Sequence, residues 1–220
     1  KTSFNLKLVY QALERRKLAE EVYVCIPRPK TGARSRSWRN MTELLKELKL
    51  AKEYYMDTVI IDDGWQTDDN NRGYAFCGDW EPIKIPDMKG LISDIHKIGM
   101  KCILWYSVPY VGIHSKAWSK FQGKFLNMYG EGKWASLDIR YKCVRDYLGE
   151  IYENAVKDWN LDGLKLDFID SFSLTNETAS VNDEMDFESL EDAIYALLKE
   201  VKERLVKINP DIMIEFRQSY

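Results

Sequence analysis

The sequence predicts an α/β protein in which five parallel strands are joined by four crossover helices. Short apolar runs of strand length alternate along the chain with longer stretches of helical periodicity. Two of these runs, Val59-Ile60-Ile61 and Gly163-Leu164-Lys165-Leu166, end in acidic residues. Continuous apolar runs are typical of buried parallel strands, and such folds place functional side chains at the carboxyl ends of those strands.

The expected elements follow one another in strict alternation. The strand-like runs are Val22–Ile26, Thr58–Asp62, Lys101–Tyr106, Gly163–Phe168 and Ile212–Phe216. The helices are marked by apolar residues 3.6 apart: Met41, Leu44, Leu45, Leu48 and Ala51; Leu91, Ile92, Ile95 and Ile98; Val144, Leu148, Ile151, Tyr152 and Ala155; and Leu190, Ile194, Leu197, Leu198, Val201 and Leu205. Gly99 fits a C-terminal cap. This order requires parallel strands and right-handed crossovers.

Residues 1–220 are expected to form one domain, with 1–21 as a leading helical segment. A complete (β/α)8 barrel needs about 250 residues. The chain is therefore expected to be either an open five-stranded sheet or a barrel interrupted after its fifth strand. Because the last residues, up to Tyr220, lie where the fifth strand would continue into its loop, we favour a fragment. The first and fifth strands would then be open edges that favour association with another chain.

Composition excludes several classes of function. The chain is 45% hydrophobic and 30% charged with a net charge of −3, so it gives no electrostatic case for nucleic acid. It has no apolar run of about 18 residues, which argues against a membrane span, and no signal-peptide pattern. With only His96 and His114 and four scattered cysteines, we expect no zinc, other metal or cofactor. Free cysteines fit a reducing, cytoplasmic compartment better than an oxidising one.

Two strand ends carry the residues most suited to chemistry. Strand alternation places Lys165 and Asp167 on one face, where a cation would keep the carboxylate ionised for nucleophilic or electrostatic work. A structural ion pair is the simpler explanation for one such strand, but the second acidic strand end, Asp62-Asp63, favours a site. The long segments Asp63–Pro86 and Ser107–Ala135 follow strand ends and are read as functional loops. Aromatic residues (13%) are explained either by a large core or by stacking against sugar rings.

Taken in order, four motifs resemble the catalytic domain of glycoside hydrolase family 36, which comprises retaining α-galactosidases. They are Asp62-Asp63-Gly64-Trp65, Gly78-Asp79-Trp80, Leu104-Trp105-Tyr106 and Leu164-Lys165-Leu166-Asp167-Phe168. The resemblance extends from about Tyr54 to Tyr220. It implies a (β/α)8 barrel, here a partial one, and an oligosaccharide or glycoside substrate.

The resemblance also implies roles for individual residues. Asp167 would be the nucleophile, and Lys165 would contact a sugar hydroxyl. Asp62 and Asp63 would bind the galactose 4- and 6-hydroxyls. The other substrate contacts would be Trp80, Trp105, Arg217 and Arg140.

The chain departs from the family pattern in three places. Its first strand runs into the basic, proline-containing segment Pro27–Arg34, and the family's N-terminal β-sandwich is absent. The family's general acid/base follows a sixth strand, which this sequence does not contain. Glu215 is the best internal substitute, but Arg217 on the same strand face would favour its ionised form rather than a proton donor. The 220 residues alone are therefore expected to be nearly inactive.

Three alternatives remain open on the sequence. The same scaffold could serve another sugar specificity or a transglycosylase, because fold and nucleophile do not fix the acceptor. A non-catalytic carbohydrate-binding domain or pseudoenzyme would keep the sugar contacts without the chemistry. An open phosphate-binding sheet would require a glycine-rich loop after the first strand, where only Gly32 is found.

Overall fold

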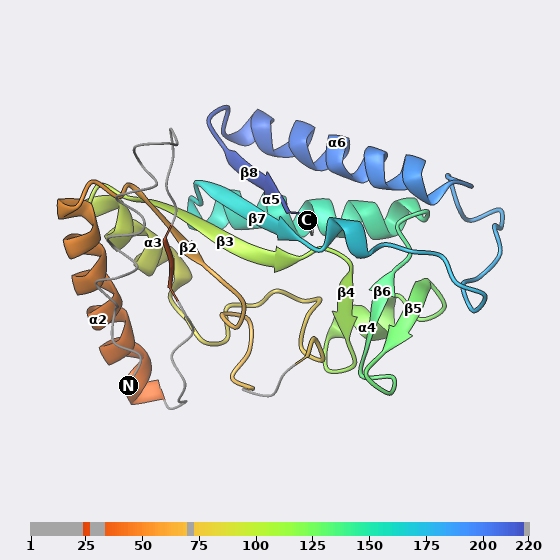
Figure 1. Ribbon diagram of the computed structural model, residues 1–220, viewed down its shortest axis with the longest axis horizontal. Helices are drawn as coiled ribbons and strands as arrows, with labels where there is room; N and C mark the ends of the chain where they lie inside the picture. The colour runs from red at the N-terminus through yellow and green to blue at the C-terminus, as the bar shows by residue number, and fades with distance from the viewer. Residues whose placement is uncertain (1–23, 27–33, 70–72, 218–220) are drawn as a thin grey trace.

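The computed structural model describes residues 24–26, 34–69 and 73–217. Its central sheet has five parallel strands, and their spatial order is the order of the chain (Figure 1). The strands are β1 (Val24–Ile26), β2 (Thr58–Ile61), β3 (Lys101–Ser107), β7 (Gly163–Asp167) and β8 (Met213–Phe216). All five predicted strands are confirmed. The expected leading segment 1–21 and the basic stretch 27–33 lie outside the described residues.

The four predicted crossover helices are also present. They are α2 (Arg34–Glu53), α3 (Met88–Lys97), α5 (Lys142–Trp159) and α6 (Leu190–Ile208). In space, α2 contacts α3, α3 contacts α5, and α5 contacts α6 (Figure 1). The helices therefore follow one another in the same order as the strands, as successive right-handed β-α-β units require.

Local sequence explains where the helices begin and end. Asp87 accepts a hydrogen bond from the Gly90 N–H at the start of α3, and Ser189 accepts one from the Asp192 N–H at the start of α6. After α3, Gly99 adopts a φ of 80°, a left-handed conformation that glycine reaches without a steric cost. The predicted C-terminal cap is thus confirmed.

The described residues form an open parallel sheet with crossover helices and no closed barrel, so the partial (β/α)8 barrel stays a prediction. The end strands of the sheet are β1 and β8. Met213, Ile214 and Phe216 of β8 are half-buried, whereas Leu164 and Leu166 of β7 are buried. Association through these edges stays a prediction. Across the described residues, no helix is both long and apolar enough to cross a bilayer.

The segment Ser107–Ala135, which the sequence predicted as a long loop, contains regular secondary structure. Residues 107–137 contain a small antiparallel sheet of order β4-β6-β5, made of β4 (Tyr110–Gly112), β5 (Phe125–Tyr129) and β6 (Trp134–Leu137), together with the short helix α4 (Lys116–Lys120). The strands are only three to five residues long and are separated by glycine-containing turns. Such short runs lack the length over which apolar periodicity can be recognised.

The segment between β7 and α6 is tied to α5 by a buried arginine. The Arg145 side chain, 1% exposed, binds Asp186 at 2.5 Å, Glu200 at 3.4 Å and the Ile139 carbonyl at 2.9 Å. A guanidinium group can satisfy several acceptors at once in a fixed geometry, which suits it to this role. The contacts hold the segment that leads from the strand-end region into α6.

The ion pair between Arg145 and Asp186 predicts that the stability of the fold depends on pH in the acid range. The Arg145 guanidinium donates to Asp186 and holds the pKa of that carboxyl below its ordinary value of 3.8. The stabilisation is therefore present above the unfolded-state pKa and is lost as the pH falls through the lower folded-state pKa. We expect Asp186→Asn to destabilise the protein slightly near neutrality, with a difference in unfolding free energy that shrinks between about pH 5 and pH 2. Urea denaturation at several pH values measures this difference.

The exposed Glu188, two residues away, provides the control. Glu188→Gln should leave the pH profile of stability unchanged. If the difference in unfolding free energy between the parent protein and Asp186→Asn stayed constant across the acid range, it would contradict the assignment of this ion pair.

Candidate functional site

The carboxyl ends of β2, β3, β7 and β8 bring the predicted site residues together. Because parallel strands end at the same edge of a sheet, side chains at their ends converge. Asp62 follows β2, Trp105 lies in β3, Asp167 ends β7, and Arg217 follows β8. Hydrogen bonds link residues 50 to 103 positions apart in the chain across this edge.

Asp167 is the most constrained carboxylate of the group. It is 5% exposed. Its Oδ1 accepts hydrogen bonds from the Phe168 N–H at 2.8 Å and the Arg217 guanidinium at 2.6 Å, and its Oδ2 accepts one from the Trp105 indole N–H at 2.8 Å. A carboxylate has about four acceptor positions. The three donors fix the orientation of the carboxylate and leave one acceptor position, on Oδ2.

The backbone after Asp167 contributes to this geometry. Phe168 has φ 65° and ψ 27°, a left-handed conformation that costs a non-glycine residue about 1–2 kcal/mol. The same residue directs its N–H to Oδ1 of the preceding aspartate. Strain of this kind persists where surrounding contacts fix it, and it concentrates at functional sites.

The predicted cation beside Asp167 is a different residue from the one expected. Lys165 lies two residues earlier on the same side of β7, but its ammonium group binds Asp62 Oδ2 at 2.9 Å. The cation on Asp167 is Arg217, and the shared hydrogen bond raises the pKa of that guanidinium. The pattern within β7 alone could not show that the cation bound to Asp167 comes from the end of the neighbouring strand, β8.

Asp63 is held by a neighbour that sequence reasoning missed. Its Oδ1 accepts a hydrogen bond from the Gln66 side-chain amide at 2.9 Å, and the Gln66 carbonyl oxygen accepts one from the Gly64 N–H at 3.0 Å. The Asp63 N–H in turn donates to Asp62 Oδ1 at 2.8 Å. Gln66 is buried, and its position just after the Asp-Asp-Gly-Trp motif is the only sequence signal that could have identified it.

Trp80 and Trp105 pack against each other, and Trp105 also contacts the Asp167 carboxylate. Trp80, 4% exposed, has its ring centroid 5.8 Å from that of Trp105 and 5.0 Å from that of Tyr106. Trp65 donates its indole N–H to the Trp105 carbonyl at 2.9 Å. Trp105 presents its N–H to Asp167, while Trp80 packs against Trp105 and is buried. Asp79, beside Trp80 in the motif, accepts hydrogen bonds from the first N–H groups of α4.

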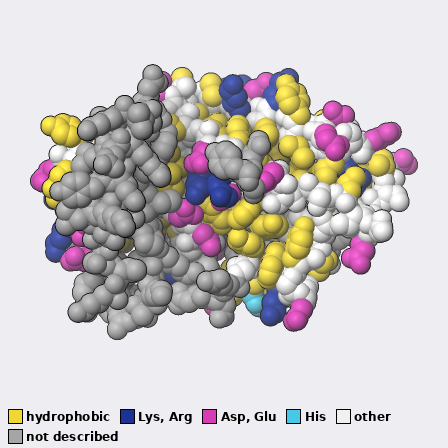
Figure 2. All heavy atoms as spheres, viewed as in Figure 1, with side chains coloured by type: hydrophobic (Ala, Val, Ile, Leu, Met, Phe, Trp, Pro, Cys, Tyr) yellow, Lys and Arg dark blue, Asp and Glu magenta, His cyan; other side chains and the backbone are white. Residues whose placement is uncertain are grey.

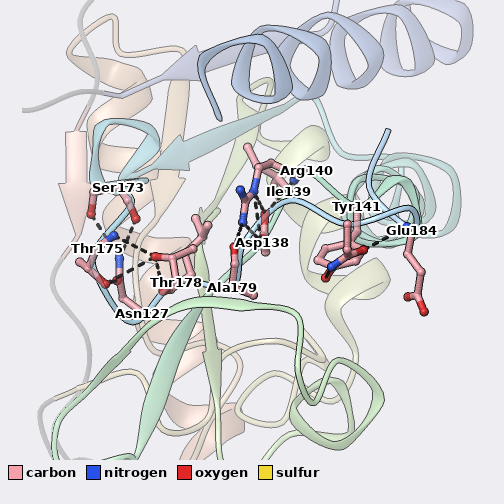
Figure 3. A network of polar contacts seen from close by, with 12 residues as sticks. Asn127, Asp138, Ile139, Arg140, Tyr141, Ser173, Thr175, Thr178, Ala179 and Glu184 are labelled. Atoms are coloured by element: carbon pink, nitrogen blue, oxygen red, sulfur yellow. Dashed lines mark hydrogen bonds and ion pairs between the residues drawn. The ribbon is translucent and has the colours of Figure 1, made fainter. Parts of the chain in front are cut away.

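The structure places Arg140 in a buried ion pair with Asp138. The two side chains are 3% and 0% exposed, and they share bonds of 3.0 Å and 2.7 Å (Figure 3). Arg140 also donates to the Ala179 carbonyl at 2.9 Å. Its partners therefore come from its own turn and from the segment after β7, and not from the strand-end group.

The same network fixes that segment to the small sheet. The Asn127 side-chain amide donates to the Ser173 carbonyl at 2.8 Å and accepts from the Thr175 hydroxyl at 2.7 Å (Figure 3). Thr178 donates to the Leu126 carbonyl at 3.0 Å.

Glu215, which the sequence offered as a substitute acid, is exposed and pairs in register with Lys165 on the neighbouring strand.

A group of partly exposed aromatic side chains lies next to Asp167. It comprises Tyr74, Tyr110, Tyr129, Trp134 and Phe168, and we call it the aromatic patch. Figure 2 shows hydrophobic side chains gathered beside basic and acidic ones at the centre of the molecule's face. Burial, with a further contribution from Asp63, raises the pKa of Tyr74 to about 12, so its phenol is neutral at ordinary pH. Sequence reasoning noted the aromatic content but did not identify this group.

Within the described ranges, no cluster of three or more His, Cys, Asp or Glu residues is arranged to hold a metal ion. The residues that meet at the strand ends supply carboxylates, cations and aromatic rings. Such groups can bind sugar hydroxyls and can attack or stabilise an anomeric carbon.

Comparison with known proteins shows that this fold is similar to that of α-galactosidases of known structure. No protein-family model and no curated protein matches the sequence. Among solved structures, the α-galactosidase from Lactobacillus brevis has a TM-score of 0.62 at 22% identity, covering 80% of this chain and 24% of that one. The GH36 α-galactosidase AgaA from Geobacillus stearothermophilus has a TM-score of 0.61 at 23% identity, covering 79% of this chain and 25% of that one.

A third neighbour is the Thermus thermophilus α-galactosidase in complex with p-nitrophenyl α-D-galactopyranoside, with a TM-score of 0.59 at 20% identity, covering 87% of this chain and 36% of that one. Two AgaA structures hold raffinose and stachyose. The present chain thus spans about a quarter of the length of the first neighbours. These similarities show a shared fold, in agreement with the motif resemblance.

Proposed function

We propose that the protein containing this chain belongs to glycoside hydrolase family 36 and is a retaining, exo-acting α-galactosidase with Asp167 as nucleophile. The observation that carries the proposal is the Asp167 carboxylate. Three donors hold it in place at the carboxyl end of β7, within a fold shared with α-galactosidases. A carboxylate fixed in this way, with an acceptor position left on Oδ2, is suited to the work of a glycosidase nucleophile.

The chemistry proceeds in two displacements. Oδ2 of Asp167 attacks C1 of the galactosyl unit, the bond from C1 to the leaving oxygen breaks, and that oxygen takes a proton from a carboxylic acid. Water then attacks C1 of the glycosyl-aspartate ester, returns a proton to the acid's carboxylate and frees Asp167. Galactose leaves with its original anomeric configuration, and Asp167 and the acid regain their starting states.

Polar residues around Asp167 are suited to the sugar hydroxyls. The Asp62 carboxylate is oriented by the Lys165 ammonium group and the Asp63 N–H, and the Asp63 carboxylate is oriented by Gln66. Such a set can accept from and donate to the hydroxyls of one hexose with little reorganisation. Trp105 and Arg217 serve the nucleophile directly, and Trp80 supports Trp105 from behind.

The acid/base is proposed to come from outside the described residues. Retention requires a second carboxyl group about 5–5.5 Å from the nucleophile. Asp62 is paired with Lys165, Asp63 with Gln66, and Glu215 is exposed. A proton donor needs the opposite environment, one that favours the neutral acid. The 220 residues alone should therefore turn over aryl α-galactosides poorly, in contrast to the full-length protein.

Covalent trapping tests the proposal directly. The full-length protein is incubated with a fluorinated α-galactosyl donor that accumulates the glycosyl-enzyme, and its peptides are examined by mass spectrometry. We expect one galactosyl adduct, on the peptide with Asp167. A full-length protein that binds galactose but forms no adduct would instead support the non-catalytic carbohydrate-binding alternative. Product profiles with other α-glycosides and acceptor sugars separate hydrolysis from transfer.

A further inference from the structure

Gln66 is a buried amide that holds an exposed carboxylate. Gln66 is 6% exposed, whereas Asp63 lies at the surface. The Gln66 Nε2 group donates to Asp63 Oδ1 at 2.9 Å, and Gln66 Oε1 accepts a hydrogen bond from the Gly64 N–H at 3.0 Å. An aspartate at the surface otherwise moves among several staggered rotamers. The bond from Gln66 therefore restricts Asp63 to one of them.

The two partners of Gln66 determine which way its amide points. A backbone N–H can only donate, so the oxygen of the amide must face Gly64. An ionised carboxylate can only accept, so the nitrogen must face Asp63. Gly64 has a φ of 105°, which glycine adopts without a steric cost. Position 66 thus requires a side chain that carries an acceptor and a donor at its end, and an apolar side chain of the same length cannot replace it.

The amide is also anchored on the side away from the carboxylate. Gln66 Nε2 lies 3.9 Å from the Sγ atom of Cys77, which is 1% exposed. The Cys77 N–H donates to the Tyr74 carbonyl at 3.1 Å, and the Cys77 carbonyl accepts from the Gly112 N–H of β4 at 2.8 Å. Gln66 is therefore held by buried, hydrogen-bonded structure. Supports of this kind keep a functional group within the narrow range of geometry that binding requires.

Asp63 lies at the same strand ends as the proposed nucleophile. Its N–H donates to Asp62 Oδ1, and Asp62 Oδ2 binds Lys165, two residues before Asp167 on β7. A carboxylate has about four acceptor positions, and Gln66 uses one of those on Asp63. Since the amide sets the orientation of the whole group, the remaining positions also have fixed directions. A hydroxyl that binds there meets an acceptor that is already in place.

We propose that Gln66 is a positioning residue for the galactosyl unit: it acts through Asp63, and it holds that carboxylate in the orientation that receives a sugar hydroxyl. This inference rests on the proposed function, because it concerns the same galactosyl unit. It gives a role in the reaction to a residue that does not itself touch the substrate. Gln66 also lies outside the four sequence motifs, the first of which ends at Trp65.

A double-mutant cycle tests whether Gln66 acts through Asp63. Gln66→Met keeps nearly the same length and volume but removes both hydrogen bonds of the amide. In the full-length protein, we expect it to lower kcat/KM for p-nitrophenyl α-galactoside about 10- to 100-fold. In the Asp63→Ala background, where the carboxylate is absent, the same substitution should lower kcat/KM by less than about threefold. Equal losses in the two backgrounds would overturn the proposal, since they would show that Gln66 only supports the fold.

Gln66→Glu tests the same role through the pH profile. A protonated glutamic acid keeps an acceptor for the Gly64 N–H and a donor for Asp63, whereas an ionised one repels the Asp63 carboxylate. Burial raises the pKa of Tyr74 and of Cys77 to about 12, so neither neighbour titrates in the assay range. We expect kcat/KM of Gln66→Glu, divided by that of the parent at the same pH, to fall at least about tenfold between about pH 4 and pH 8.

Gln122 supplies the matched control, because it is an exposed glutamine in the turn between α4 and β5. Gln122→Met and Gln122→Glu should leave kcat/KM and its pH profile unchanged. A ratio of Gln66→Glu to parent that does not vary with pH would overturn the proposal, and this result does not depend on the stability of Gln66→Met. If the parent protein hydrolyses no α-galactoside, the proposed function fails. Hydrolysis by the parent together with additive losses in the cycle rejects only the role of Gln66.

Discussion

Replacing Asp167 with alanine is expected to lower kcat for α-galactoside hydrolysis by about 10³-fold or more, because the first displacement loses its nucleophile. Steady-state kinetics with an aryl α-galactoside in the full-length protein measure the effect. Added azide should restore turnover in the variant. It attacks C1 in the space left by the carboxylate and expels the leaving group in one displacement, so the product should be the β-galactosyl azide.

Asp170 gives a control within the same turn. It is exposed and lies three residues after the proposed nucleophile. Asp170→Ala should change kcat by no more than about threefold and should give no azide product. Retention of activity in Asp167→Ala, or azide-dependent turnover in Asp170→Ala but not in Asp167→Ala, would contradict the assignment of Asp167.

Replacing Arg140 with alanine is expected to have the largest effect on stability, about 3–5 kcal/mol. Asp138 is 0% exposed, and the substitution would leave its charge buried without its bidentate partner. It would also remove the bond to the Ala179 carbonyl that ties the segment after β7 to this turn. Urea denaturation followed by circular dichroism measures the loss.

A double variant separates the ion pair from a role in substrate binding. Asp138→Asn combined with Arg140→Met removes both charges, so it should recover a substantial part of the stability lost in Arg140→Ala. The KM of folded Arg140→Ala for an aryl α-galactoside should match that of the parent. A raised KM with unchanged stability would instead restore the substrate contact that the sequence resemblance implied for Arg140.

Much of the fold could be predicted because it depends on local patterns. Apolar runs, helical periodicity and cap residues such as Gly99 are properties of neighbouring residues, and all five strands and four crossover helices were predicted from them. The small sheet β4-β6-β5 could not be predicted in this way. Its strands are short, and they are stabilised by pairing with one another.

The sequence predicted which residues lie at the candidate site, but it did not predict which of them contact one another. Parallel strands had to bring Asp62, Asp167 and Arg217 to one edge, and the structure confirms that they converge. The ion pairs differ from expectation, since Lys165 binds Asp62 and Arg217 binds Asp167. Which side chains can contact one another across neighbouring strands depends on the strand register and on side-chain length. Arg140 was expected at the sugar, yet it lies in a buried ion pair with Asp138.

The sequence by itself determined the five strands of the central sheet, the four crossover helices, their order, and the edge of the sheet at which the acidic residues gather. Those features follow from periodicity and from the geometry of parallel β-α-β units. Only the tertiary structure decided which cation binds Asp167, which tryptophan donates to it, and that aromatic side chains from separate segments contact Phe168, the residue after it. These are contacts between residues far apart in the chain, and their distances are fixed by packing rather than by any local pattern.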